Sequence, residues 1–596
     1  MVAANTSQGA YFSQSWGWVA LAFLVPAALA LILGRPEAPG RLRAAFALLL
    51  GGLALWVAVS ATWSLSPSGS LREVERMVVY VSLALAVAVV LRRGDAPALA
   101  AGVLAGIVGV SGYGLATRLL PDVLGAYDVA EGYQLYRPIG YKNAVGLLSA
   151  LGAVLAGGAL VHARPIWGRV AAGASLPVLV VTLYFTFSRG AWAAMAFGLL
   201  VTFVVDSRRV AFLVATAVVA PVSAVAVVYA SRQESLTHED ATIARAADDG
   251  RRLLVVLVVL AALSGALAGA WALVARRFPL SRRFRRAVEV AVAALAAAAL
   301  AAGLVAVGGP RAAAVELKDR FDAPYRPNEA DLNTRFFSVS GNRRSEPLGV
   351  AWDMAAERPL AGYGAGTFEY VWYERRPTDK VLRDAHSLYL ETFAELGAVG
   401  LGMLALALAL PLVGAAAGRR ARLVPPAAGA YCAWAAHAGL DWDWEIVGLT
   451  ATALLAGSVP LLGAERRPRR PLPGSLRQPA LAVAVGLSVV AVVSLVGNQA
   501  LFAGKEAVAR KEWRSARDHA RRAEALLPWS HEPVLVVGDA QAGLGNRAAA
   551  LEAYREAVDL DPRNWVAWLR LAQVASGRER AEAYARVHEL DRKAHV

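Results

Sequence analysis

The stretch DAHSLYLETFAELGAVGLGMLALALALPLVGA, residues 384–415, runs from a polar segment directly into an apolar one. From Ala394 to Ala415 its only charged residue is Glu395. About 20 apolar residues suffice for an α-helix to cross a bilayer. Similar runs recur along the first 500 positions, and the chain is 57% hydrophobic and 18% charged, against about a quarter charged in soluble proteins. The sequence therefore predicts an all-α, polytopic helical membrane protein embedded in a lipid bilayer.

The apolar runs predict about fourteen spans. They are expected at roughly 17–34, 43–61, 76–91, 97–117, 143–161, 169–187, 190–205, 209–230, 253–274, 287–308, 394–415, 424–439, 446–463 and 478–498. The N-terminal MVAANTSQGAYFSQS lacks the basic segment of a signal peptide, so the first run is expected to be retained as a helix. Cys432 is the only cysteine, which excludes an intramolecular disulfide.

Basic residues fall in alternate loops. These loops are 34–43, 91–94, 163–169, 207–209, 275–286, 418–422 and 465–470. Because cytoplasmic loops of membrane proteins are rich in Lys and Arg, we expect these loops in the cytoplasm and the others outside. The net charge of +15 is explained by these loops, and no nucleic-acid partner is predicted.

The expected organisation has five parts. They are N-terminal transmembrane helices at 1–130, a transmembrane core at 131–308, an extracytoplasmic loop domain at 309–393, C-terminal transmembrane helices at 394–498 and a helical tail at 499–596. In the tail, SARDHARRAEALLP (515–528) resembles AALEAYREAVDLDP (549–562), 34 positions later. That is the tetratricopeptide period, so the tail is predicted to be an extracytoplasmic α-solenoid that binds a protein partner or positions the acceptor, with a plain helical hairpin as the structural alternative.

Two clusters of cations are expected at the outer ends of spans. In YRPIGYKNAVGLL (136–148), Arg137 and Lys142 could contact lipid headgroups, or could bind an anion at the start of the helix that Asn143 would cap. In FSRGAW (187–192), Arg189 could extend along the membrane surface into water, or could face a cavity at a helix break.

A third cluster, SGNRRSEPLGVAWDMAAERPLAGYGAGTFE (340–369), combines two arginines with a glycine-rich segment. Arg343 and Arg344 precede a short amphipathic helix. Gly362, Gly364 and Gly366 suit a tight turn or a close backbone approach.

The opening stretch supplies a histidine. We expect Asp384 to cap a helix that carries His386, and Gly397 to break that helix before the span. His386 could be a surface imidazole, or could take a proton from a hydroxyl group at neutral pH.

A fifth segment, HAGLDWDWE (437–445), alternates acidic residues with tryptophans. Asp441, Asp443 and Glu445 could hold a divalent cation, but an aromatic belt at the membrane interface explains the tryptophans without a metal. No metal and no cofactor are predicted. Arginines beside a histidine suit transfer from a lipid-linked diphosphate, because guanidinium groups bind phosphate oxygens and imidazole activates the acceptor hydroxyl.

The order of these motifs between about 130 and 460 resembles the O-antigen ligase and O-antigen polymerase superfamily of bacterial membrane glycosyltransferases. The resemblance is carried by the Ser-Arg-Gly break at 188–190, the loop arginines, ERPLAGYGAGTFE (357–369) and AHSLYLETFAELG (385–397). Ser387 stands where the family usually has asparagine, and Lys142-Asn143-Ala144 stands where it often has Asn-Pro-Asn.

The resemblance implies a glycan donor linked to undecaprenyl diphosphate and a lipid, glycan or protein acceptor. It implies Arg189 and Arg344 as diphosphate ligands, with Arg343 as the alternative to Arg344, and His386 as the catalytic residue. Arg137 is a further candidate ligand, and Asn143, Ser387 and Asp441 are candidate supporting residues. It also implies a bacterial cytoplasmic membrane location with the catalytic loop outside. A polysaccharide exporter or flippase, or a scaffold acting through the tail, are the alternatives.

Overall fold

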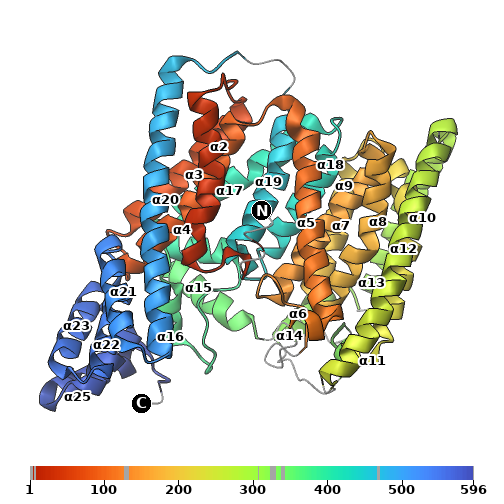
Figure 1. Ribbon diagram of the computed structural model, residues 1–596. Helices are drawn as coiled ribbons and strands as arrows, with labels where there is room; N and C mark the ends of the chain where they lie inside the picture. The colour runs from red at the N-terminus through yellow and green to blue at the C-terminus, as the bar shows by residue number, and fades with distance from the viewer. Residues whose placement is uncertain are drawn as a thin grey trace.

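The structure is a computed structural model of the 596-residue chain, and it describes residues 5, 8–125, 133–239, 241–278, 280–306, 308–322, 331–336, 343–465 and 470–594. Residues 340–342 of the third cluster and most of the basic loop 465–470 lie outside that description. Over the described residues the chain is helical, and its β structure is limited to two isolated bridges. The long helices stand side by side as a bundle (Figure 1), which confirms the predicted all-helical membrane architecture.

The bundle consists of long apolar helices. They are α2 (Trp16–Ile32), α3 (Arg41–Ser60), α4 (Pro67–Val89), α5 (Ala96–Leu119), α7 (Lys142–His162), α8 (Ile166–Phe185), α9 (Arg189–Val205), α10 (Arg209–Ser231), α12 (Ile243–Arg277), α13 (Arg282–Ala306), α17 (Leu388–Gly418), α18 (Val424–His437), α19 (Val447–Gly463) and α20 (Gly474–Ala509). Each of the fourteen predicted spans overlaps one of these helices.

Ten helices among the described residues are long and apolar enough to cross a membrane. Two more, α9 and α19, are apolar but have 17 residues each, and α18 has 14. The predicted span 76–91 belongs to α4, which begins earlier and carries Glu73, Glu75 and Arg76 in its first half. The number of spans therefore stays a prediction.

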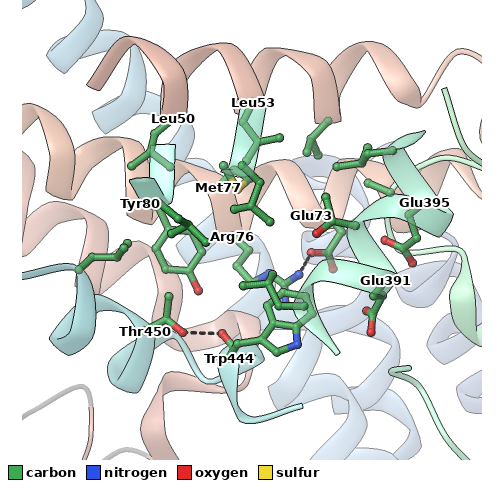
Figure 2. A pocket seen from close by; sticks show the side chains of 18 of the residues that line it. Leu50, Leu53, Glu73, Arg76, Met77, Tyr80, Glu391, Glu395, Trp444 and Thr450 are labelled. Atoms are coloured by element: carbon green, nitrogen blue, oxygen red, sulfur yellow. Dashed lines mark hydrogen bonds and ion pairs between the residues drawn. The ribbon is translucent and has the colours of Figure 1, made fainter. Parts of the chain in front are cut away.

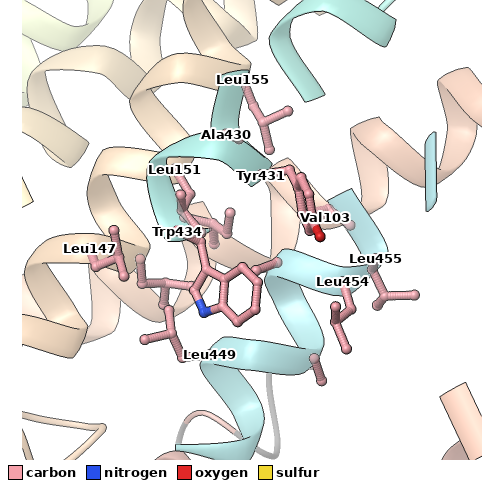
Figure 3. Close-up of a cluster of buried hydrophobic side chains, with 14 of the residues drawn as sticks. Val103, Leu147, Leu151, Leu155, Ala430, Tyr431, Trp434, Leu449, Leu454 and Leu455 are labelled. Carbon is pink, nitrogen blue, oxygen red and sulfur yellow. The ribbon is translucent and has the colours of Figure 1, made fainter. Parts of the chain in front are cut away.

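The centre of the bundle is built around α7, α18 and α19. Trp434 and Tyr431 of α18 are among the largest fully buried side chains. In Figure 3 they lie among leucines of α7 and α19. Helices approach closely here because small residues line the contacts: a Cβ at Gly198 would stand 2.8 Å from the Gly429 carbonyl oxygen. This packing holds α7, α9 and α18 in fixed positions, and each leads into the polar end described below.

The loops gather at two ends of the bundle, as the alternation of charge predicts. At one end, Glu37 forms an isolated β-bridge with Pro471, and Arg422 donates a hydrogen bond to the His162 carbonyl. At the same end, Arg169 lies close enough to Arg276 and Arg208 for the positive charges to repel one another. At the other end, the loop 440–445 contacts both the segment before α7 and the loop domain. The described residues of the basic loops therefore lie at one end of the molecule, and the candidate site residues lie at the opposite end.

The loop domain and the tail lie at this second end. The loop domain contains α14 (Pro310–Asp322), α15 (Ser345–Glu357) and α16 (Phe368–Arg375). The tail continues α20 with α21 (Trp513–Leu526), α22 (His531–Gly543), α23 (Arg547–Leu560), α24 (Trp565–Val574) and α25 (Gly577–Leu590), which lie beside α16 in Figure 1. The helix α21 precedes α23 by 34 residues at both ends, and α22 begins 34 residues before α24. The helices thus follow the sequence repeat, while assignment to the tetratricopeptide class stays a prediction.

The expected helix start at Asp384 is wrong. The helix α17 begins at Leu388, and Ser387 is its N-cap, with its hydroxyl accepting a 3.5 Å hydrogen bond from the Leu390 amide. His386 precedes the helix with a φ of 62° and so does not share a helical face with the residues that follow. The predicted break is present, because Gly397 leaves helical geometry with a φ of 66°.

Candidate functional site

A polar cavity at the second end brings together most of the predicted site residues. Those lining it are Asn143, Arg189, Arg343, Arg344, His386 and Asp441. They come from five separate parts of the chain: the start of α7, the start of α9, the start of α15, the strap before α17 and the loop after α18. Residues up to 300 positions apart in sequence are hydrogen-bonded here, so the cavity is a product of the fold.

Asp441 connects several side chains of this cavity by hydrogen bonds. Its side chain is buried, and one carboxylate oxygen accepts from Arg344 at 2.6 Å and from Asn143 at 2.7 Å. The other oxygen accepts from the Tyr141 hydroxyl at 2.9 Å and the Trp442 amide at 2.8 Å. Burial alone would raise the pKa of Asp441, but the nearby cations, chiefly Arg344, hold that pKa below its usual value. Asp441 therefore stays ionised and fixes the side chains around it.

Arg344 sits at the N-cap position of α15 and is the better placed of the two loop arginines. Besides binding Asp441, it donates to the Leu440 carbonyl at 2.6 Å. Arg343 has a φ of 56° and a side chain that is 47% exposed, 3.7 Å from Glu346. Both line the cavity, but Arg344 is held by two short contacts, whereas Arg343 is more exposed and has a longer contact with Glu346.

Arg189 is the first residue of α9. Ser188 caps that helix by accepting from the Ala191 amide at 3.3 Å, which places the positive end of the helix dipole beside the Arg189 charge. Gly190 packs against His437, and a Cβ there would stand 2.9 Å from its Nε2 atom. A larger residue at this position would have to displace the His437 imidazole, so glycine suits this close contact. The Ser-Arg-Gly motif is thus a helix start that directs a cation into the cavity.

His386 is half-buried in the wall of the cavity. Burial lowers its pKa below the ordinary value, with Asp441 opposing that effect, so the imidazole is neutral at neutral pH. Its Nδ1 atom lies 3.1 Å from the Asp384 carbonyl oxygen, which can only accept. The proton of the neutral ring therefore belongs on Nδ1, and the lone pair of Nε2 is available to accept another proton.

Three predicted residues have other surroundings than expected. Asn143 does not cap α7; Tyr141 holds that position, and Asn143 instead donates to Asp441. Ser387 caps α17 and is not among the residues that line the cavity. Arg137 is exposed, with its guanidinium 6.0 Å from the centre of the Tyr136 ring, and it too is not among the lining residues.

The cavity also contains cations other than the diphosphate ligands that the resemblance implied. Lys142, Arg335 and Lys380 join the three arginines in its lining, so six cations surround one carboxylate. Lys142 was recognisable from its position before a span, whereas Arg335 and Lys380 lie in loop segments without a sequence signature. Such an excess of positive charge favours a multiply charged anion.

The wall that carries His386 is held by two buried glutamates of α17. Glu391 accepts from the Ala385 amide at 2.7 Å, which ties down the residue before His386. Glu395 accepts from the amides of Gly366 and Phe368 at 2.8 Å each. The glycine-rich turn thus approaches α17, and its three glycines all have positive φ as the tight turn requires. Figure 2 shows both glutamates among the residues that line a second, mainly apolar cavity.

The three acidic residues of the 437–445 segment pair with three different side chains. Asp441 binds Arg344, Asp443 lies 3.2 Å from His437, and Glu445 binds Arg76. Among the described residues, ligand-like spacing is found instead for Asp384, Glu391 and Glu445, whose oxygens lie within 4.8 Å of one another. Arg76 already supplies positive charge to Glu445, so this group is adequately explained as an ion-pair network.

Fold and site together define a polytopic helical membrane protein with a cationic, histidine-containing cavity at one end. Residues 250–405 match the family model for O-antigen ligase, a segment that includes Arg343, Arg344 and His386. The match supports the resemblance to the O-antigen ligase superfamily that the order of the motifs indicates. The family supports a membrane glycosyltransferase-like function. A comparison with curated proteins gives no match.

Proposed function

We propose that this protein transfers a glycan from a polyprenyl diphosphate carrier, such as undecaprenyl diphosphate, to a hydroxyl group of an acceptor. The observation that carries the proposal is the cavity in which six cations and a neutral histidine surround a single carboxylate. A diphosphate monoester or diester carries several negative charges and many acceptor oxygens, which guanidinium groups bind through charge-assisted hydrogen bonds.

In the proposed reaction the acceptor oxygen attacks the anomeric carbon of the donor sugar. The bond between that carbon and the diphosphate oxygen breaks, and its electron pair leaves with the polyprenyl diphosphate. Arg189 and Arg344 stabilise the charge that develops on this leaving group, with Arg343 on its exposed stem able to join them. The acceptor proton passes to Nε2 of His386, whose Nδ1 proton is held by the Asp384 carbonyl.

Asp441 supports both halves of this reaction. It orients Arg344 through the 2.6 Å ion pair, and its charge favours the imidazolium form that His386 adopts after taking the proton. Asn143 and Tyr141 in turn orient Asp441. Ser387 acts indirectly, since its hydroxyl fixes the start of α17 directly after the histidine.

We place the reaction outside the cytoplasmic membrane of a bacterium. The support for this location is the gathering of basic loops at the opposite end of the bundle, because such loops are retained in the cytoplasm. A lipid, a glycan chain or a protein could supply the acceptor hydroxyl, and the cavity itself favours none of them.

The test is transfer of radiolabelled glycan from its native polyprenyl diphosphate carrier in membranes that contain the full chain. His386→Ala should abolish transfer while leaving insertion unchanged. His519→Ala is the matched control, because His519 is an exposed histidine of α21. Transfer by His386→Ala at the control rate would contradict the proposal.

A further inference from the structure

A second polar cavity, of about 400 Å³, lies between the tail and the loop domain. Its lining includes Tyr373 of α16, Trp565 and Arg570 of α24, Lys505 of α20 and Arg72 of α4. We call it the tail cleft. It opens at the same end of the bundle as the candidate active site, but the residues that line the two cavities are different.

One strap of chain, residues 380–386, separates the two cavities. Lys380, Leu382 and His386 line the candidate active site, whereas Arg383 lines the tail cleft. One short strap thus contributes side chains to both cavities, so the two cavities are neighbours in the fold.

The tail is fixed against the loop domain by buried polar contacts. Arg376 binds both carboxylate oxygens of Asp591, at 2.8 and 2.9 Å, and both side chains are buried. Asp561 accepts from the Tyr370 hydroxyl at 2.7 Å and from Ser66 at 2.8 Å. Because α20 runs without interruption from the bundle into the tail, the cleft has walls of fixed spacing.

The charges that line the tail cleft nearly balance, and ion pairs hold the charged side chains in place. Its ion pairs are Arg570 with Asp539 at 3.0 Å, Arg383 with Glu369 at 3.3 Å, and Arg72 and Lys505 with Glu532. Four cations thus face three carboxylates, in contrast to six against one in the active site. Beside them the rings of Tyr373 and Trp565 lie 5.8 Å apart.

We propose that the tail cleft is a binding site for the glycan chain that the active site transfers or extends. Sugar hydroxyls both donate and accept hydrogen bonds, which suits paired guanidinium and carboxylate groups held in place by one another. The aromatic rings offer apolar surfaces for the C–H faces of the sugar. A polyanion is disfavoured by the near balance of charge. This inference rests on the proposed function, which places the reducing end of a glycan on the other side of the strap.

The test measures binding of one probe to the purified full chain in lipid nanodiscs. The probe is the oligosaccharide that mild acid releases from the polyprenyl diphosphate pool of the host, and saturation-transfer NMR reports its dissociation constant. Trp565→Ala and Arg570→Gln should each weaken binding at least tenfold. Their matched controls are Trp568→Ala, on the same helix but outside the cleft lining, and Arg578→Gln, whose side chain is 92% exposed. Neither control should change binding.

His386→Ala separates this inference from the proposed function. It should bind the oligosaccharide as the wild type does while losing transfer. If the wild type transfers glycan but does not bind the probe, or if both cleft variants bind like their controls, the cleft assignment is wrong and the proposed function stands. If a synthetic Ser-Ala-Thr repeat peptide binds in place of the oligosaccharide, and Trp565→Ala abolishes that binding, the cleft takes a protein acceptor and the glycan assignment is overturned.

Discussion

The buried carboxylate of Asp441 offers the sharpest test of how the site is held together. Asp441→Asn keeps the size of the side chain but removes its charge. An amide has one accepting oxygen, so its NH₂ group must face either the donors of Arg344 and Asn143, which lie 2.6 and 2.7 Å from one oxygen, or the donors of Tyr141 and Trp442 on the other. In either orientation the substitution loses hydrogen bonds that the carboxylate accepts, and it leaves Arg344 without its counterion.

The expected magnitude follows from burial. Breaking a fully buried ion pair by removing one partner costs about 3–5 kcal/mol. Arg344 is 28% exposed, so water compensates part of that loss and we expect about 2–3 kcal/mol. If the same interaction orients Arg344 in the transition state, transfer should fall about 30- to 150-fold.

Two measurements check this expectation. Thermal unfolding in detergent should show a lower midpoint for Asp441→Asn, and the transfer assay should show the fall in rate. Asp353→Asn is the matched control, since Asp353 is an exposed residue of α15. Stability and transfer both equal to those of the control would refute the role assigned to Asp441.

Three further predictions follow from particular contacts. The rate of transfer should fall as pH drops through the pKa of His386, which burial lowers below its ordinary value of about 6.5. Asp441→Asn should shift this acidic fall in rate to still lower pH, because it removes a negative charge that raises the pKa of His386. A shift of the fall to higher pH would contradict this reasoning. Gly397→Ala should destabilise the protein by more than about 2 kcal/mol in thermal unfolding, since its φ and ψ of 66° and −169° are accessible essentially to glycine alone. Gly402→Ala, on the same helix and with open space around it, should leave the stability unchanged. Glu391→Gln should lower the rate of transfer more than it weakens donor binding, because it loosens the strap at Ala385; equal losses in both would argue for a general structural role.

Much of the architecture could be predicted from periodic or cumulative signals. Apolar runs predicted helices at all fourteen positions, and alternating basic loops predicted the two ends of the bundle, because both signals sum over many residues. The repeat of 34 residues likewise predicted the order of tail helices. The apolar pattern did not predict where α4 begins, because its first half carries charged residues that are buried by contacts with distant parts of the chain.

The motifs included most of the candidate residues that line the cavity, but they did not reveal the contacts between those residues. Asn143 looked like a helix cap, and only the fold shows that its partner is Asp441, 298 positions away. Arg335 and Lys380 carry no local signature, so their presence in the cavity depends on how the loop domain packs. His386 was expected on a helix. It instead precedes the helix, and its own left-handed backbone conformation sets the direction of its side chain. Such features depend on long-range contacts that a single sequence does not reveal.

The central claim is that the cations bind the diphosphate and that His386 takes the acceptor proton. It is tested most directly by measuring, for the same purified variants, binding of undecaprenyl diphosphate and single-turnover transfer of glycan. We predict that Arg344→Ala and Arg189→Ala lose binding at least tenfold, and that His386→Ala binds undecaprenyl diphosphate normally but transfers no glycan. Undiminished binding in both arginine variants, or transfer by His386→Ala at the wild-type rate, would contradict the account.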